Sequence, residues 1–164
     1  MIRGAQGREN RLAVPWISAR RAGGQLASSP MSMQVLVDAD NVSPARVRAL
    51  LAELPPDAHI VVVGSPRAVA DVEWPPSADV HEATGWQRAD LALAEIYRGG
   101  DDPLVLVSGD GDFALLAQQH RGPVLVVSEA ASERLRRVAT VIDPVHDGVE
   151  RLRAWIAAVL EIGL

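Results

Sequence analysis

Two pairs of aspartates carry the clearest chemical signal in this sequence. Each pair follows a short apolar run: Asp38 and Asp40 come after residues 35–37, and Asp110 and Asp112 come after residues 104–107. Apolar runs of this length are typical of strands buried in a parallel sheet. A charged group at the exit of a buried strand costs free energy unless something compensates it. A bound divalent cation is the usual compensation where several carboxylates meet.

The residue types favour a hard cation, Mg²⁺ or Mn²⁺, as the cofactor. Carboxylates within a few ångströms of one another repel and raise one another's pKa, and a cation relieves that repulsion. Mg²⁺ takes oxygen ligands from one or two carboxylates and from substrate phosphates. The chain has no cysteine, which excludes a thiolate zinc site, and its four histidines are scattered without ligand spacing.

Further acids divide into a candidate ligand and residues with other roles. Asp90 lies in the first turn of a predicted helix, where it is a candidate ligand, although the helix dipole also favours an acid there. Asp112, near the start of another predicted helix, has the same structural alternative. Glu95 lies about 140° around the helix from Asp90 and should point elsewhere. Asp101 and Asp102 are predicted to be turn residues before a strand. A solvated linker and helix start is predicted for Asp143, Asp147 and Glu150.

Strands and helices are expected to alternate from residue 34 onward. Predicted strands cover 34–38, 59–63, 79–82, 104–107 and 123–127, with a short edge strand at 140–142. Predicted helices cover 44–54, a short segment after 64–66, 87–97, 112–120, 131–138 and 147–161. This alternation predicts an α/β fold with a parallel sheet of about five strands and helices on both faces. Ser43, as N-cap, and Pro44 mark the first helix start.

The predicted sheet brings the aspartates together if its strands have the order 3-2-1-4-5. Parallel α/β sheets bind ligands beyond the carboxyl ends of the strands, at the point where the strand order reverses. With the assumed order, the strands that end at Asp38 and near Asp110 are neighbours at that point.

Length and composition indicate one domain. Residues 31–164 are predicted to form it, including a C-terminal helix with an apolar stripe, while residues 1–30 are expected to be a disordered extension. Met31 and Met33 lie just before the first strand, which favours a start codon assigned too far upstream. No apolar run is long enough to span a membrane. We expect a cytoplasmic protein, with homodimerisation through the terminal helix as an alternative to packing on its own domain.

The charge of the predicted domain opposes a nucleic-acid partner at long range. All sixteen basic residues of the chain are arginine. Residues 31–164 contain eleven arginines against twenty acids, a net charge of −9. Because such a body repels a polyanion, an interaction with nucleic acid needs local compensation, by cations or by arginines near the site.

Three segments together resemble the NYN family of the PIN-like nuclease superfamily, which includes LabA-type and limkain-type proteins. They are Val37-Asp38-Ala39-Asp40-Asn41, Arg88-Ala89-Asp90-Leu91-Ala92-Leu93 and Val107-Ser108-Gly109-Asp110-Gly111-Asp112-Phe113. The resemblance covers residues 34–142 and implies a PIN-like three-layer α/β/α sandwich. It also implies hydrolysis of RNA, short or single-stranded, by one or two Mg²⁺ or Mn²⁺ ions. The implied metal-binding and catalytic residues are Asp38, Asp90, Asp110 and Asp112.

The resemblance and the predicted strand exits suggest residues that surround the metal. Asn41 would support the first motif, and Ser108 would be a polar residue beside the metals. Arginines near strand exits are candidates to hold neighbouring phosphates, with plain surface arginine as the alternative: Arg67, Arg88 and Arg121. Trp86 could stack a base or simply pack, whereas Trp74 and Trp155 are expected to pack. The family often has a lysine shortly before the helical aspartate, where this chain has Gln87-Arg88.

Three other functions stay open at this point. The spacing of Asp38 and Asp40 also resembles the first motif of haloacid-dehalogenase-type phosphatases, but their chemistry normally needs a lysine and this chain has none. A catalytically weak NYN-like module with a regulatory or protein-binding role fits the acidic body. A third variant is a nuclease toxin paired with an antitoxin protein.

Overall fold

The apolar runs form the strands of a six-stranded, all-parallel sheet in the computed structural model, which describes residues 32–83 and 89–162. The strands are β1 (Gln34–Asp38), β2 (His59–Gly64), β3 (Asp79–Glu82), β4 (Leu104–Val107), β5 (Val124–Val127) and β6 (Thr140–Ile142). Their order is β3-β2-β1-β4-β5-β6, and every neighbouring pair is parallel. The predicted order is therefore confirmed, with the short strand β6 added at one edge.

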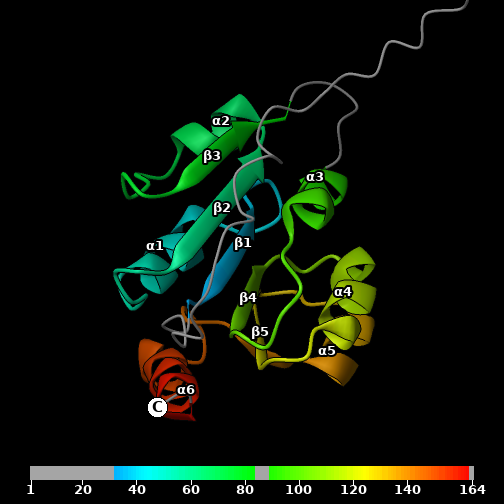
Figure 1. The fold of residues 1–164 in the computed structure, drawn as a ribbon. Helices are drawn as coiled ribbons and strands as arrows, with labels where there is room; N and C mark the ends of the chain where they lie inside the picture. Colours follow the sequence, from blue (N-terminus) through cyan, green and yellow to red (C-terminus); the bar gives the residue numbers. More distant parts are fainter. Residues whose placement is uncertain (1–31, 84–88, 163–164) are drawn as a thin grey trace, which may run out of the picture.

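Helices cover both faces of the sheet, which confirms the three-layer α/β/α sandwich. They are α1 (Pro44–Leu51), α2 (Pro66–Ala70), α3 (Ala89–Ile96), the 3₁₀ helix η1 (Gly111–Phe113), α4 (Ala114–Gln119), α5 (Glu133–Val138) and α6 (Val149–Ile162). Side chains of α1, α2 and α6 share one buried cluster, and those of α3, α4 and α5 share the other. Figure 1 shows α3, α4 and α5 together on one side of the sheet. The predicted extension over residues 1–30 lies outside the described residues.

The central strands are buried on both faces, as uninterrupted apolar runs predict. Every residue of β1 and β4 is buried. Val35 and Val37 pack into the cluster under α1 and α6, whereas Leu36 packs into the cluster under α3 and α4. Because side chains alternate along a strand, both helical layers are tied to the same short segment. The two central strands therefore hold the loops that follow them in fixed positions.

Helix ends differ from the predictions by a few residues. The first helix ends at Leu51, before the predicted limit of 54. The predicted helix over 112–120 begins as the 3₁₀ turn η1, because Asp110 caps this turn with its side chain. Ser43 has the backbone conformation of an N-cap but makes no side-chain cap. Its hydroxyl oxygen instead accepts a hydrogen bond from Arg46 at 2.9 Å.

The terminal helix α6 packs on its own domain. Leu152, Ile156 and Val159 are buried in the cluster that includes α1, with Trp155 against it, so the predicted apolar stripe is confirmed. Trp74 also packs there, and its indole nitrogen donates to the backbone oxygen of Val69 at 2.9 Å. Over the described ranges, we find no helix with the length and hydropathy needed to cross a membrane.

Candidate active site

The strand order reverses between β1 and β4, and polar side chains follow both strands at this point. The register pairs Val37 with Val107, so the residues that come next, Asp38 and Ser108, lie side by side. The Ser108 hydroxyl donates a long hydrogen bond of 3.4 Å to Oδ2 of Asp38. This confirms the expected neighbourhood of the two strand exits, where parallel α/β sheets commonly bind ligands.

Asp38 is a buried carboxyl group that pairs with no cationic side chain within residues 32–83 and 89–162. Only 6% of the residue is exposed. Burial raises the pKa of Asp38 from 3.8 to about 6, and the charges of Asp40 and Asp110 add to the rise. The hydrogen bond from Ser108 and one from the backbone of Asp40 oppose it. Asp40 and Asp110 thus lie close enough to Asp38 to disfavour its charged form.

The loop after β4 is built by hydrogen bonds around Ser108 and Asp110. The backbone N–H of Asp110 donates to the Ser108 hydroxyl oxygen at 3.1 Å, and the N–H of Asp112 donates to Oδ1 of Asp110 at 3.0 Å. The Asp110 carboxylate therefore caps η1 while it faces the strand exit. A Cβ atom on Gly109 would lie 2.7 Å from the backbone oxygen of Ala130, so only glycine fits at this position.

Asn41 joins the two loops of the candidate site. Its side-chain oxygen accepts a hydrogen bond of 3.0 Å from the backbone N–H of Gly109. The backbone N–H of Asn41 donates to the backbone oxygen of Asp38 at 3.1 Å. The loop after β1 is thereby fixed to the loop after β4, while the role that the resemblance implies for Asn41 stays a prediction.

Asp40 faces the start of α2. Its two carboxylate oxygens accept hydrogen bonds from Ser65, one from the backbone N–H at 2.7 Å and one from the hydroxyl at 2.6 Å. The Ser65 hydroxyl oxygen also caps α2 by accepting from the N–H of Ala68 at 3.3 Å. Sequence reasoning missed this link. The Ser65-Pro66 pattern signals a helix start, but nothing local connects it to an acid 25 residues earlier.

The two other predicted ligands lie on neighbouring elements. Asp90 is half-buried in the first turn of α3, which packs against β1 and β2, and Asp112 is exposed in η1. Within residues 32–83 and 89–162, no three acidic or histidine side chains form a recognisable metal-binding group. The four-aspartate metal site implied by the resemblance therefore stays a prediction. The candidates Arg88 and Trp86 lie outside the described residues.

The donor atoms at the strand exits fit a hard cation in their chemistry. Asp38 and Asp110 offer carboxylate oxygens, and Ser108 offers a hydroxyl beside them. Mg²⁺ is commonly bound by one or two carboxylates with waters and substrate phosphates completing its shell. The raised pKa of Asp38 shows that the folded protein disfavours its charged form, which a cation would stabilise.

Of the proposed phosphate-binding arginines, Arg67 lies at this edge of the sheet and Arg121 does not. A hollow of about 370 Å³ opens beside Asp40 and Asn41, and Arg67 on α2 lines it. Arg121 precedes β5, so it lies at the amino ends of the strands, where it pairs with Asp101 at 3.0 Å. The expectation for Arg121 was wrong because the residue comes before a strand and not after one.

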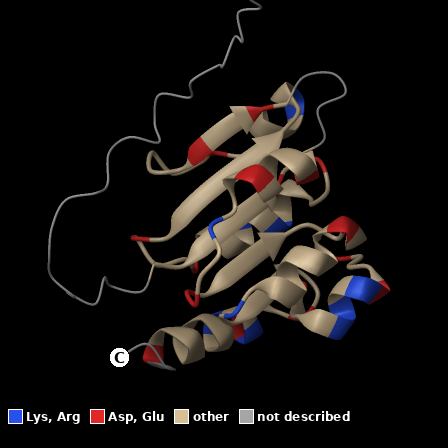
Figure 2. Ribbon diagram, turned by 45° about the vertical axis from the view of Figure 1, so that its right-hand side comes forward, with Lys and Arg blue, Asp and Glu red and all other residues tan. Residues whose placement is uncertain are grey.

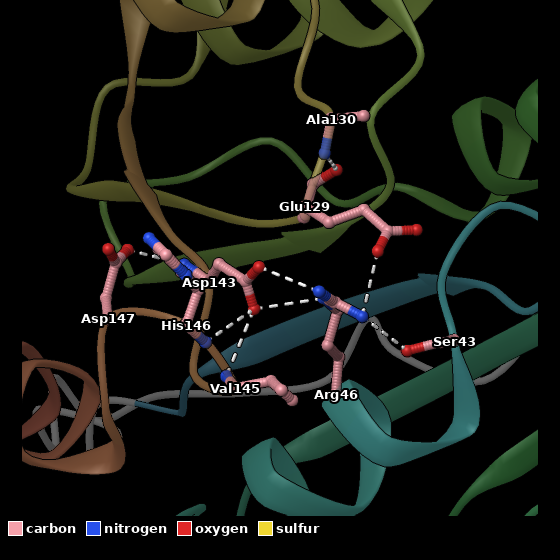
Figure 3. A network of polar contacts seen from close by, with 9 residues as sticks. Ser43, Arg46, Glu129, Ala130, Asp143, Val145, His146 and Asp147 are labelled. Carbon is pink, nitrogen blue, oxygen red and sulfur yellow. Dashed lines mark hydrogen bonds and ion pairs between the residues drawn. The ribbon is translucent and has the colours of Figure 1, made fainter.

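Arg46 is paired with two acids in a second polar cluster at the same edge (Figure 3). The Arg46 guanidinium donates to both carboxylate oxygens of Asp143, at 2.9 and 2.8 Å, and lies 2.9 Å from Glu129. The Arg46 hydrogen bonds lower the pKa of Asp143. The interpretation of Asp143 as a solvated linker residue was wrong, since its side chain is only 13% exposed. This network ties α1 to the loop after β6.

Comparisons of the chain with protein-family models, with curated proteins and with solved structures find no match. The resemblance to the NYN family therefore rests on the three sequence motifs alone.

Proposed function

We propose that this chain is a metal-dependent ribonuclease that hydrolyses phosphodiester bonds of short or single-stranded RNA in the cytoplasm. The observation that carries the proposal is the buried Asp38 carboxyl group beside Asp110, at the point where the strand order reverses. A group with a strongly raised pKa at such a place is a functional-site candidate. The three NYN-like motifs supply the choice of RNA as substrate.

The side chains have distinct roles under this proposal. Asp38 and Asp110 provide oxygens for Mg²⁺ or Mn²⁺, with Asp90 and Asp112 as further ligands. Such a cation, when bound, activates a water molecule and stabilises charge on the scissile phosphate. Ser108 orients the Asp38 carboxylate through its hydroxyl, and Asn41 fixes the spacing of the two loops. Because Asp38 must be deprotonated to bind a cation, activity should rise with pH through about 6.

The test is a cleavage assay with short single-stranded RNA and DNA, with and without Mn²⁺. We expect cleavage of RNA that requires Mn²⁺, and a loss of about a hundredfold or more in Asp110→Asn. Asp101→Asn is the matched control, because Asp101 is exposed at the opposite edge of the sheet and should leave the rate unchanged. Wild-type rates in Asp110→Asn, or no metal-dependent cleavage by the wild type, would contradict the proposal.

A catalytically weak regulatory module is the second candidate, favoured by the engagement of Asp40. Both oxygens of this carboxylate are bonded to Ser65, so Asp40 is held by the protein itself. The same contact disfavours the phosphatase alternative, which uses a second aspartate two residues after the first and normally needs a lysine that this chain lacks. Mn²⁺ binding without RNA cleavage would support the regulatory role.

A further inference from the structure

A second hollow lies on the other side of the candidate site, between α4 and α5. Its volume is about 380 Å³, and Gly111 and Asp112 line it, directly after Asp110 in the loop that follows β4, here called the aspartate loop. Arg134 and Arg137 of α5 line it, together with Leu115 of α4, whose side chain is 63% exposed. The volume is in the range of small-ligand sites, and the hollow is continuous with the loop that carries Asp110.

The Arg134 side chain lies over the aspartate loop and is available to bind a ligand. Its Cδ atom lies 3.5 Å from where a Cβ of Gly111 would be, so the side chain passes directly over the aspartate loop. Within the described ranges, its guanidinium has no hydrogen bond or ion pair. Arg46 and Arg153, by contrast, are each bound to two carboxylates.

The two hollows beside the site differ in charge. The one beside α2 is lined by Arg67 and by three acids, Asp40, Asp71 and Glu129. The one between α4 and α5 is lined by two arginines and one acid, Asp112. Figure 2 shows basic residues gathered on α5 in a chain where acids outnumber bases. The phosphates of a strand bound at the aspartates should therefore be attracted toward α5 more than toward α2.

We propose that the groove between α4 and α5 binds the phosphate backbone of a single-stranded RNA next to the scissile bond, with Arg134 as the principal phosphate-binding residue. The inference rests on the proposed ribonuclease function and adds the direction of the substrate. The planar guanidinium suits a phosphate, to which it can donate two parallel hydrogen bonds. The exposed Leu115 gives the groove an apolar wall against which a ribose or base can pack.

Arg137 contributes less than Arg134. It lies 3.5 Å from Glu133 on the same helix, and both side chains are about three-quarters exposed, so the pair is weak but lowers the net charge that Arg137 offers. Arg136, the third arginine of α5, faces a different hollow and donates to the backbone oxygen of Ala131 at 3.1 Å. The contribution to RNA binding should therefore decrease within one helix from Arg134 to Arg137 to Arg136.

The test measures binding without cleavage, by fluorescence anisotropy of a labelled oligouridine in EDTA. We expect Arg134→Gln to weaken binding about tenfold, because the variant loses one charge-assisted phosphate contact. The slope of log affinity against log salt should fall by about 0.7, the value for one phosphate contact on a single strand. The matched control is Arg98→Gln, which changes the net charge equally at an exposed arginine near the opposite edge of the sheet.

Competition arms identify the ligand. Uridine monophosphate and inorganic phosphate should displace the labelled oligouridine only weakly, whereas unlabelled oligouridine should displace it fully. Full displacement by inorganic phosphate at the concentration of unlabelled RNA would show an anion site and overturn the proposal. Melting temperatures of the variants should match the wild type, because within residues 32–83 and 89–162 the Arg134 side chain makes no hydrogen bond or ion pair that the substitution would remove.

The outcomes separate this inference from the proposed function. Wild-type affinity in Arg134→Gln overturns the groove, even if Asp110→Asn confirms the nuclease. Equal losses in Arg134→Gln and Arg98→Gln overturn it too, because they show only a general effect of charge, and so does a wild type that does not bind oligouridine at low salt. Binding that depends on Arg134 in a protein that cleaves nothing upholds the groove and rejects the nuclease.

Discussion

Asp38 is the last residue of β1 and Asp143 follows β6, so both lie at the carboxyl edge of the same sheet, yet their surroundings are opposite. Asp143 accepts two hydrogen bonds from Arg46 and one from the backbone N–H of Val145, and these contacts lower its pKa. Asp38 accepts one long hydrogen bond from the Ser108 hydroxyl and one from the backbone of Asp40, and burial together with neighbouring acids raises its pKa to about 6. Burial opposes the charge of both carboxyls: it is the largest influence on Asp38, whereas at Asp143 the hydrogen bonds from Arg46 outweigh it.

The charge of Asp143 stabilises the folded state, whereas the charge of Asp38 destabilises it. The Arg46–Asp143 pair connects α1 to the loop after β6 and stabilises the folded state whenever Asp143 is charged. The folded state instead disfavours the charged form of Asp38. A protein that keeps such a group at the point where the strand order reverses is expected to use it on a ligand.

Removing each charge should change stability in opposite directions, the largest effect that we expect from this comparison. Asp143→Asn should lower the free energy of unfolding by about 2–3 kcal/mol, because it leaves Arg46 without its bidentate partner. Asp38→Asn should raise it by about 1–3 kcal/mol at pH 8 in the absence of metal. Urea titrations of both variants measure the effect. If both variants shift in the same direction, the contrast between the two aspartates is wrong.

The pH dependence should sharpen the contrast. The folded-state pKa of Asp38 lies above its ordinary value, so folding takes up a proton between about pH 4 and 6. Stability relative to Asp38→Asn should therefore fall as pH rises through this window. The folded-state pKa of Asp143 lies below its ordinary value of 3.8, so its contribution is present above that pH and lost as pH falls below it. The free energy of unfolding of the wild type and of each variant, measured at steps of about one pH unit between pH 3 and 8, would reveal the two opposite slopes.

Metal binding should distinguish the two regions by a smaller amount. At about tenfold excess over its Kd, Mn²⁺ should raise the melting temperature of the wild type by about 3–5 °C. Asp110→Asn should abolish the rise, whereas Asp143→Asn should keep it on a lower baseline. Differential scanning fluorimetry gives both values. A rise that survives in Asp110→Asn would place the cation away from the strand exits.

Much of the fold could be predicted because its signals are local. The run from Val35 to Val37 is uninterrupted and apolar, as a strand buried on both faces requires, and β1, β3, β4 and β6 have the predicted bounds. Helix ends were less accurate, as at Leu51 and at the 3₁₀ turn before Ala114. These ends depend on which side chain caps the turn, and apolar periodicity does not contain that information.

The candidate site could be predicted in its residues but not in its contacts. Asp38 and Asp110 stood out because acids follow buried strands. The partners of Asp40 and Arg46 lie 25 and 97 residues away in the sequence, so no local pattern connects them. The position of Arg121 was misjudged for the related reason that strand polarity, and not nearness to a strand, decides which edge of the sheet a residue reaches.

The sequence by itself determined the alternation of strands and helices and the identity of the acids at the strand exits, because hydrophobic periodicity and residue type are properties of short segments. Only the tertiary structure decided which of those acids forms an ion pair with an arginine. Arg46 reaches Asp143 across the folded chain and leaves Asp38 with a hydroxyl and other carboxylates. The free energy of a buried charge depends on its neighbours in space, and those neighbours exist only once the sheet has brought distant segments together.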